Sequence, residues 1–347
     1  MNFFPRCSIK SQPRLEGPLG FLAMQKTNQK RKQASLLYLF LSLPVFILIS
    51  GSSSAAVIKS HAALTIDAST GEILFSKNSD SRLPPASTTK LMTAIVAIEN
   101  ENLSKLVTIS RKASHAKPSR TGFKEGDQVA IEGLLYAALL ESANDAAIAI
   151  AEAIAGSESR FVPLMNEKAL SIGARDTKFI NATGLPGNGQ YTTALDLSKI
   201  LSYALRFPKL RKIMGSPVAI ITTEAGKVFY LRSTDKLLWS DEKIIGGKTG
   251  FTFQAGHCFV CAAQAESKTI LVAILGSPSR KRLWTDTEKL ISTNLQGRPP
   301  IRYSFLSYFV RFLLYKGSSF FAPSSPEQSP PYPRWQFSPS PMPESGS

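Results

Sequence analysis

Segments with strand patterns lie on both sides of a long helical stretch, and this arrangement restricts the fold more than any other feature of the sequence. Residues 62–67 and 73–75 are rich in strand formers and are separated by a turn signal, which predicts a hairpin. The last strong strand patterns lie at 255–263 and 269–275. Because helical patterns occupy most of the chain between these strands, we expect an α+β fold in which an antiparallel sheet packs against helices.

The patterns between the strands predict the rest of the domain. A stripe of apolar residues follows Pro84-Pro85-Ala86, so Ser87 should lie at or near the N-terminus of a helix. The other predicted elements are helices at 131–140 and 145–155, a helix-loop-helix unit over 161–205, strands at 218–222 and 228–231, a basic turn at 280–282, and a final helix that ends near 295.

The N-terminal region has the order of a secretory signal peptide. Basic residues at 30–32 precede a nearly unbroken apolar stretch at 36–49, and small residues follow at 54–56. The apolar stretch is shorter than the roughly 20 residues that a membrane-spanning helix needs, which favours a cleaved signal over a permanent anchor. We interpret 1–56 as a basic region and signal peptide of an exported protein. The basic region has a conventional length if synthesis begins at Met24, so we predict that Met24 is the true start.

The composition changes again after the predicted final helix. Residues 298–321 are aromatic and basic, and 322–347 are rich in proline and serine. The second segment has the composition of a disordered tail. Two interpretations of the first stay open: a helix on a membrane surface, with Arg311 and Lys316 reaching the headgroups, or a packed terminal helix. Residues 57–297 remain as the predicted folded domain.

The net charge of +16 is concentrated at the two ends of the chain. No zinc-finger, RNP-type or basic-zipper pattern accompanies this charge, so nucleic acid is not an expected partner. We favour attraction to an anionic membrane or cell-wall polymer, and improved solubility is the alternative.

Cys258 and Cys261 have a C-x-x-C spacing, but they do not predict a metal site. The sequence has no second pair of this kind, and side chains three positions apart in a strand point to opposite faces. We therefore expect two separate core thiols. The histidines at 61, 115 and 257 have no accompanying cluster of ligands, so neither a metal nor another cofactor is expected.

Ser87 and Lys90 form an S-x-x-K motif that places a hydroxyl and an amine on one face of the predicted helix. An amine that has lost its proton can act as the base for such a hydroxyl. The spacing alone is weak, because it also occurs at 114–117, 233–236 and 240–243.

Two further motifs follow in order. Ser142 and Asn144 belong to an S-x-N sequence on a predicted loop between helices. Lys248, Thr249 and Gly250 make the only K-T-G in the chain, at the beginning of a predicted strand. S-x-N is weak by itself, because it recurs elsewhere in the sequence. The ordered combination of S-x-x-K, S-x-N and K-T-G is specific, and it is typical of class A β-lactamases and penicillin-binding proteins.

On these motifs the chain resembles the low-molecular-weight penicillin-binding proteins of the D-alanyl-D-alanine carboxypeptidase family. The similarity covers roughly 62–295 and includes the segment at 181–186. It implies a β-lactamase/transpeptidase-like α+β fold, with an antiparallel sheet flanked by helices and an all-helical subdomain. It also implies that 57–297 is a penicillin-binding catalytic domain that trims the terminal D-alanine from peptidoglycan pentapeptides. The implied location is the periplasm or the outer face of the bacterial cytoplasmic membrane, and β-lactam antibiotics are implied ligands.

The resemblance assigns roles to the motif residues. Ser87 is the implied nucleophile, Lys90 the implied base, and Ser142 a proton relay to the departing D-alanine. Asn144 would hold the substrate backbone or position Lys90. Burial of Lys90 beside the cationic Lys248 is expected to lower its pKa, as a base requires.

The K-T-G strand is the implied substrate side of the site. Lys248 and the Thr249 hydroxyl suit the terminal carboxylate, and Gly250 would leave room for substrate along the strand edge. The backbone N–H groups of Ser87 and Phe251 are the implied oxyanion hole.

Three alternatives stay open. A β-lactamase would add a Glu-x-x-Leu-Asn sequence, and the nearest match, which begins at Glu167, lacks the Asn and lies in an amphipathic run typical of a solvated helix. A transpeptidase or endopeptidase differs in the acceptor that reaches the acyl-enzyme, which a sequence does not reveal. A non-enzymatic wall-binding protein is disfavoured because all the motif side chains are present.

Overall fold

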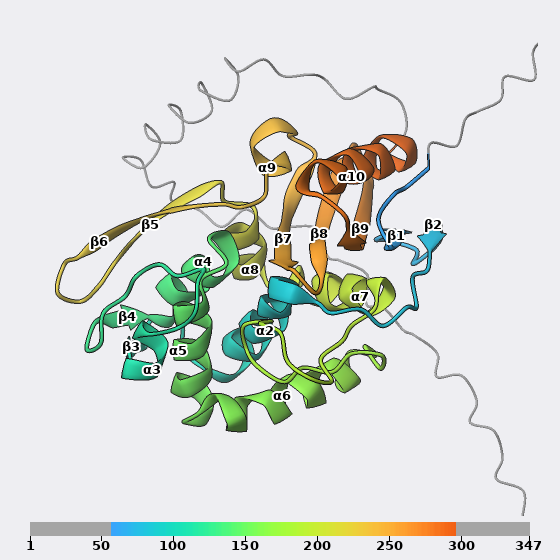
Figure 1. Ribbon diagram of the computed structural model, residues 1–347. Helices are drawn as coiled ribbons and strands as arrows, with labels where there is room; N and C mark the ends of the chain where they lie inside the picture. The colour runs from blue at the N-terminus through green and yellow to red at the C-terminus, as the bar shows by residue number, and fades with distance from the viewer. Residues whose placement is uncertain (1–56, 296–347) are drawn as a thin grey trace, which may run out of the picture. The chain divides into compact units, whose positions relative to one another are not determined.

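The computed structural model describes residues 57–295 (Figure 1). The predicted signal peptide, the start at Met24, the aromatic and basic segment at 298–321 and the tail at 322–347 lie outside the described residues. Within 57–295, no helix combines the length and the apolar character that crossing a membrane would need.

A five-stranded antiparallel sheet forms the centre of the domain, as the sequence predicts. Its strand order is β2-β1-β9-β8-β7, so the first strand of the domain pairs with the last one. The strands are β1 (Ala62–Asp67), β2 (Ile73–Lys77), β7 (Ile244–Thr252), β8 (Gly256–Ala265) and β9 (Lys268–Ser277). The middle residues of β8 and β9 are buried on both faces, because helices cover both sides of the sheet. Strand β7 lies at the edge of the sheet.

Two apolar cores lie on the two faces of this sheet. Helix α10 (Arg280–Asn294) packs against β8 and β9 on one face, and α7 (Ala194–Ala204) packs against the sheet on the other (Figure 1). Cys258 belongs to the core on the α7 side, and Cys261 belongs to the core on the α10 side. Both thiols are free and buried. The expectation of two separate core thiols on opposite faces is confirmed.

The helical region is built around α5. Buried alanines along this helix allow α2, α4 and α6 to approach it closely. Its elements are the 3₁₀ turn η1 (Ala86–Thr89), α2 (Lys90–Asn100), α3 (Arg111–Ser114), α4 (Ile131–Leu140), α5 (Asn144–Ala155), α6 (Glu158–Ser171) and α8 (Pro208–Met214). The contact between α2 and α5 matters for function, because these two helices begin at Lys90 and Asn144.

Short strands accompany the helices. Strands β3 (Leu106–Thr108) and β4 (Gln128–Ala130) pair within the region expected to be all-helical, and their shortness leaves little sequence pattern. Strands β5 (Val218–Thr222) and β6 (Val228–Arg232) form the predicted strand pair, which leads to the short helix α9 (Leu237–Ser240).

Two local expectations are wrong. The basic residues at 280–282 do not form a turn before the last helix but are the first turn of α10, because the Ser279 hydroxyl accepts a hydrogen bond from the Arg282 amide and caps the helix there. The K-T-G residues do not begin a strand. They lie in the second half of β7, which already starts at Ile244 because that residue pairs with Ala263 of β8.

Candidate active site

Ser87 lies in the 3₁₀ turn η1, immediately before α2. The residue before it, Ala86, has a left-handed backbone with φ of 49°, a conformation that a non-glycine residue adopts only where its surroundings enforce it. Two glycines, one on each side, lie very close to this turn. A Cβ on Gly184 would lie 1.8 Å from the carbonyl oxygen of Ala86, and one on Gly250 would lie 2.9 Å from the amide nitrogen of Ser87. The turn is therefore held between the loop that contains Gly184 and strand β7.

The structure brings the first two motifs together at the Lys90 amine. Its Nζ lies 3.0 Å from the Ser87 Oγ and donates hydrogen bonds to the Asn144 Oδ1 and the Thr183 carbonyl, each at 2.7 Å. The Asn144 amide group in turn donates to the carbonyls of Lys117 and Pro118. Asn144 is therefore fixed in the orientation that offers its oxygen to Lys90.

The environment of Lys90 favours the neutral amine. Lys90 is fully buried, and burial lowers its pKa well below 10.5; the positive charge of Lys248 lowers it further, and Asp145 opposes the change. A neutral amine has two N–H groups and one lone pair. If the two N–H groups bind Asn144 and Thr183, the lone pair faces the Ser87 hydroxyl. The arrangement can therefore take a proton from Ser87.

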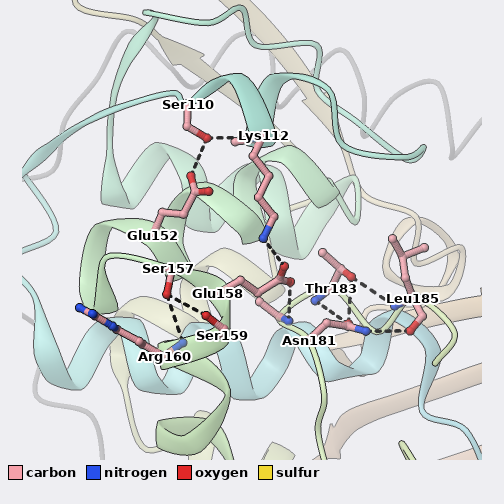
Figure 2. Close-up of polar contacts among 12 residues, drawn as sticks. Ser110, Lys112, Glu152, Ser157, Glu158, Ser159, Arg160, Asn181, Thr183 and Leu185 are labelled. Carbon is pink, nitrogen blue, oxygen red and sulfur yellow. Dashed lines mark hydrogen bonds and ion pairs between the residues drawn. The ribbon is translucent and has the colours of Figure 1, made fainter. Parts of the chain in front are cut away.

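The Thr183 carbonyl is a partner of Lys90 that sequence reasoning missed. Figure 2 shows how its loop is held: the Asn181 Oδ1 accepts hydrogen bonds from the Thr183 amide and hydroxyl, and the Asn181 amide donates to the Leu185 carbonyl at 2.9 Å. The Asn181 Oδ1 also accepts the Gly184 amide at 2.7 Å. The turn formers at 181–186 were visible in the sequence, but a backbone acceptor has no side-chain signature.

Glu158 anchors the same loop to α6. One carboxylate oxygen accepts the Ala182 amide at 3.0 Å, and the other pairs with Lys112 at 2.9 Å (Figure 2). Ser157 caps α6 by accepting the Arg160 amide, which places Glu158 in the first turn of the helix. The Thr183 carbonyl, which accepts a hydrogen bond from Lys90, therefore lies in a loop that α6 holds in place.

The K-T-G motif supplies the other wall of the site. Lys248 is buried, and its Nζ donates to the Thr249 carbonyl at 3.0 Å. Burial lowers the pKa of Lys248 to about 7, although the carboxylate of Asp235 opposes this shift. The Thr249 hydroxyl lies 2.6 Å from the Thr234 hydroxyl. Thr234 and Asp235 are further residues that the sequence analysis missed, since 233–236 looked like one of several chance S-x-x-K matches.

Gly250 has a packing role in addition to the room for substrate that the sequence predicts. The space that a Cβ would need is taken by η1, including the amide nitrogens of Ser87 and Thr88, so the glycine allows β7 to pack against the nucleophile turn. The K-T-G strand and Ser87 are therefore direct neighbours.

Ser142 and Phe251 complete the residues predicted from the sequence. Ser142 lies between α4 and α5 with φ of 64°, a strained conformation in the residue pair that precedes Asn144. Phe251 is half-exposed, and its ring stacks on His257 with centroids 4.4 Å apart. Within 57–295, no group of three or more His, Cys, Asp or Glu side chains is arranged to hold a metal ion.

Comparison with known proteins agrees with this geometry. The profile of the peptidase S11 D-alanyl-D-alanine carboxypeptidases matches residues 50–279. The chain belongs to this family. Among its relatives, D-alanyl-D-alanine carboxypeptidase DacF of Bacillus subtilis is 30% identical over 67% of this chain, and DacC of Escherichia coli is 30% identical over 74%. The chain spans 61% and 66% of the lengths of these two S11 proteins.

Solved structures of S11 proteins share the fold. The Streptomyces K15 DD-transpeptidase matches with a TM-score of 0.64 and 31% identity, over 68% of this chain and 96% of that chain. A D-alanyl-D-alanine carboxypeptidase from Mycobacterium tuberculosis matches with a TM-score of 0.67 and 28% identity, over 72% and 96%. The predicted α+β fold, with an antiparallel sheet flanked by helices, is confirmed.

Proposed function

We propose that this chain is a serine-type D-Ala-D-Ala carboxypeptidase that removes the terminal D-alanine from peptidoglycan pentapeptides through an acyl-enzyme on Ser87. The observation that carries the proposal is the contact between the Ser87 hydroxyl and a buried amine, Lys90, whose pKa lies well below its ordinary value. Membership in the S11 family supports the same reaction.

In the acylation step, the neutral Lys90 amine takes the Ser87 proton while Oγ forms a bond to the carbonyl carbon of the scissile D-Ala-D-Ala amide. The backbone N–H groups of Ser87 and Phe251 stabilise the negative charge on the carbonyl oxygen. Collapse of the tetrahedral intermediate breaks the C–N bond. The leaving D-alanine nitrogen takes a proton through the Ser142 hydroxyl, and the proton originates from Lys90.

In deacylation, water attacks the ester carbon and gives its proton to the same amine. The bond between Ser87 Oγ and the acyl carbon then breaks, Oγ takes the proton back from Lys90, and the shortened peptide is released as its carboxylate. The cycle therefore returns Lys90 to its neutral state and consumes one water molecule. Lys90 acts as base in both halves because Asn144 and Thr183 hold it beside Ser87 throughout.

The Lys248 side of the site suits a negatively charged group. The Lys248 ammonium and the Thr249 hydroxyl are the groups that we assign to the terminal carboxylate of the peptide. A β-lactam antibiotic also carries a carboxylate next to a reactive amide, so penicillins should acylate Ser87.

A second candidate is transfer or hydrolysis at a cross-link. The structural relative from Streptomyces is described as a DD-transpeptidase, and a D-alanyl-D-alanine endopeptidase of Escherichia coli is 29% identical over 69% of this chain. A β-lactamase is less well supported. Glu167, the nearest candidate for its water-activating carboxylate, is exposed on α6, which agrees with the predicted solvated helix.

Export follows from the proposed substrate, because peptidoglycan lies outside the cytoplasmic membrane. We propose the periplasm or the outer face of that membrane as the location, with membrane association through 298–321 as a further part of the proposal.

The test is release of D-alanine from diacetyl-L-Lys-D-Ala-D-Ala by the full chain. The wild type should release D-alanine, and Ser87→Ala should not. Ser114→Ala is the matched control, since Ser114 belongs to another S-x-x-K sequence, on α3, and should leave the rate unchanged. Penicillin acylation of Ser87 without D-alanine release would contradict the carboxypeptidase proposal and favour a transpeptidase or endopeptidase.

A further inference from the structure

Asp235 is a buried carboxylate for which the reaction above has no use. Its side chain is 2% exposed, and its Oδ1 accepts hydrogen bonds from the amides of Leu237 and Leu238 at 2.9 and 3.3 Å. The other oxygen, Oδ2, is buried and has no hydrogen-bond partner among the described residues. A buried carboxyl group without a donor at one oxygen tends to become protonated, and a nearby positive charge favours its ionised form instead.

The fold places that carboxylate against the K-T-G strand. Thr234, its neighbour in sequence, contacts the Thr249 hydroxyl through its own hydroxyl at 2.6 Å. The Thr234 amide and hydroxyl also donate to the Leu140 carbonyl at 3.0 and 3.1 Å, which fixes this segment to the end of α4. Burial raises the pKa of Asp235 to about 7, whereas the Leu238 and Leu237 amides and the positive charge of Lys248 oppose this rise. The attraction between Asp235 and Lys248 therefore acts on both groups, and Asp235 is mostly ionised above neutral pH.

Other titratable groups interact with this pair. On the nucleophile side, Lys90 feels the charges of Lys248 and Asp145. On β8, the buried thiol of Cys261 lies opposite Gly247; burial raises its pKa, and the charges of Asp235 and Asp241 raise it further. Among these groups, Asp235 is the one that favours the charged form of Lys248.

The geometry points to Asp235 as a positioning residue, which raises the protonated fraction of Lys248 beside Thr249 and thereby helps Lys248 to bind the carboxylate of a D-Ala-D-Ala peptide or a β-lactam. This inference rests on the proposed function and deepens it. Burial lowers the pKa of Lys248, and the negative charge of ionised Asp235, whose Oδ2 has no hydrogen-bond partner among the described residues, opposes that decrease.

Two consequences follow for Asp235→Asn. Without the carboxylate, the pKa of Lys248 falls below about 7, so less ammonium is available for the ligand carboxylate at neutral pH. With less positive charge on Lys248, the pKa of Lys90 rises, so less neutral base is available. The pH range in which a carboxylate ligand reacts should therefore narrow from both sides.

The test compares two β-lactams that differ by one charge. Acylation of Ser87 by benzylpenicillin and by its methyl ester is followed by intact mass in the full chain, from pH 6 to 9. The Lys90 effect is common to both ligands, so the acid-to-ester ratio of acylation rates isolates the carboxylate contact. In Asp235→Asn this ratio should fall about tenfold, at pH 8, for each unit by which the pKa of Lys248 drops.

Controls separate this role from a structural one. Asn keeps an oxygen acceptor for the Leu237 and Leu238 amides, and Asp235→Ser offers a second uncharged acceptor that should lower the ratio equally. Asp241→Asn removes a carboxylate of the same segment that does not act on Lys248, and it should leave the ratio unchanged. In a Lys248→Gln background, Asp235→Asn should have no further effect on the ratio.

An equal loss of rate for acid and ester, or an unchanged ratio in both Asp235 variants, would overturn the inference while leaving the proposed function intact. A wild type that is acylated but releases no D-alanine would refute the carboxypeptidase activity alone. A wild type that neither β-lactam acylates would refute both proposals.

Discussion

Lys90 and Lys248 are both buried, both donate to neutral oxygens and each has one carboxylate that opposes the shift of its pKa, but Lys90 also feels the positive charge of Lys248. Lys90 contacts Ser87, Asn144 and Thr183, and its pKa is driven far down. Lys248 is equally buried, but its pKa stays at about 7. Neutral oxygens can hold an amine in place without keeping its proton. The same side chain can therefore serve as a base at one wall and as a cation at the other.

Loss of the Lys90 amine should have the largest effect on activity. Lys90→Met removes the proton acceptor of Ser87, so acylation by a fluorescent penicillin should slow by about 10²- to 10⁴-fold. Lys243→Met is the matched control, because Lys243 belongs to the S-x-x-K sequence at 240–243, and its acylation rate should stay at the wild-type level. Wild-type acylation by Lys90→Met would show that another group takes the proton.

Loss of the Lys248 charge should have a smaller and more selective effect. Lys248→Gln removes a charge-assisted hydrogen bond to the ligand carboxylate, so acylation by benzylpenicillin should slow by about 10- to 100-fold. The methyl ester of benzylpenicillin should react with Lys248→Gln at close to the wild-type rate at high pH. If Lys248→Gln slows acylation by benzylpenicillin and by its methyl ester equally, Lys248 does not act by binding the ligand carboxylate.

The same variant should change the pH profile at the other lysine. The Lys248 charge lowers the pKa of Lys90, so its removal raises that pKa. Acylation needs the neutral amine and rises with pH as Lys90 loses its proton. The acidic limb of the profile for the uncharged ester should therefore move to higher pH in Lys248→Gln. A limb that does not move, or that moves to lower pH, would refute the coupling between the two walls.

Packing around the nucleophile turn gives a test by stability. Gly184→Ala would place a Cβ 1.8 Å from the Ala86 carbonyl oxygen at a φ of +79°, so it should lower the free energy of unfolding by about 2–4 kcal/mol. Gly189→Ala, at a φ of +84° with open space around it, should lose only about 1 kcal/mol. Thermal unfolding compares the two, and equal losses would show that η1 is not held by the 181–186 loop.

The smallest effect is expected at the outer support of that loop. Glu158→Gln keeps an acceptor for the Ala182 amide but breaks the ion pair with Lys112, which is partly exposed, so acylation should slow by about threefold or less. Lys112→Gln should give a similar small change. A loss of acylation comparable to that of Lys90→Met would mean that the loop depends on this charge rather than on its backbone hydrogen bonds.

The fold was largely predictable because its signals are local. The helix at 131–140 and the strand at 218–222 agree with α4 and β5 in their bounds, and the C-x-x-C spacing correctly predicted two thiols on opposite faces of a strand. The 3₁₀ turn at Ser87 was expected only as the start of a helix. Its geometry is set by Gly184 and Gly250, which are distant in sequence.

The site was predictable where it consists of motif side chains and hidden where it depends on tertiary contacts. Contact with Lys90 was one of the two roles expected for Asn144, and the Lys90 Nζ lies 2.7 Å from the Asn144 Oδ1. The Thr183 carbonyl carries no side-chain signal. Asp235 lies in one of the chance S-x-x-K sequences, and only the packing of 233–236 against β7 distinguishes it from an ordinary surface aspartate.

Direct titration of the two lysines tests the account most closely. In NMR of the full chain with lysine labelled at the ε carbon, the resonance absent from Lys90→Met should titrate well below 10.5. The resonance absent from Lys248→Gln should titrate at about 7 and move to a lower pKa in Asp235→Asn. Titration of both lysines at or above their ordinary pKa would contradict the assignment of Lys90 as the neutral base.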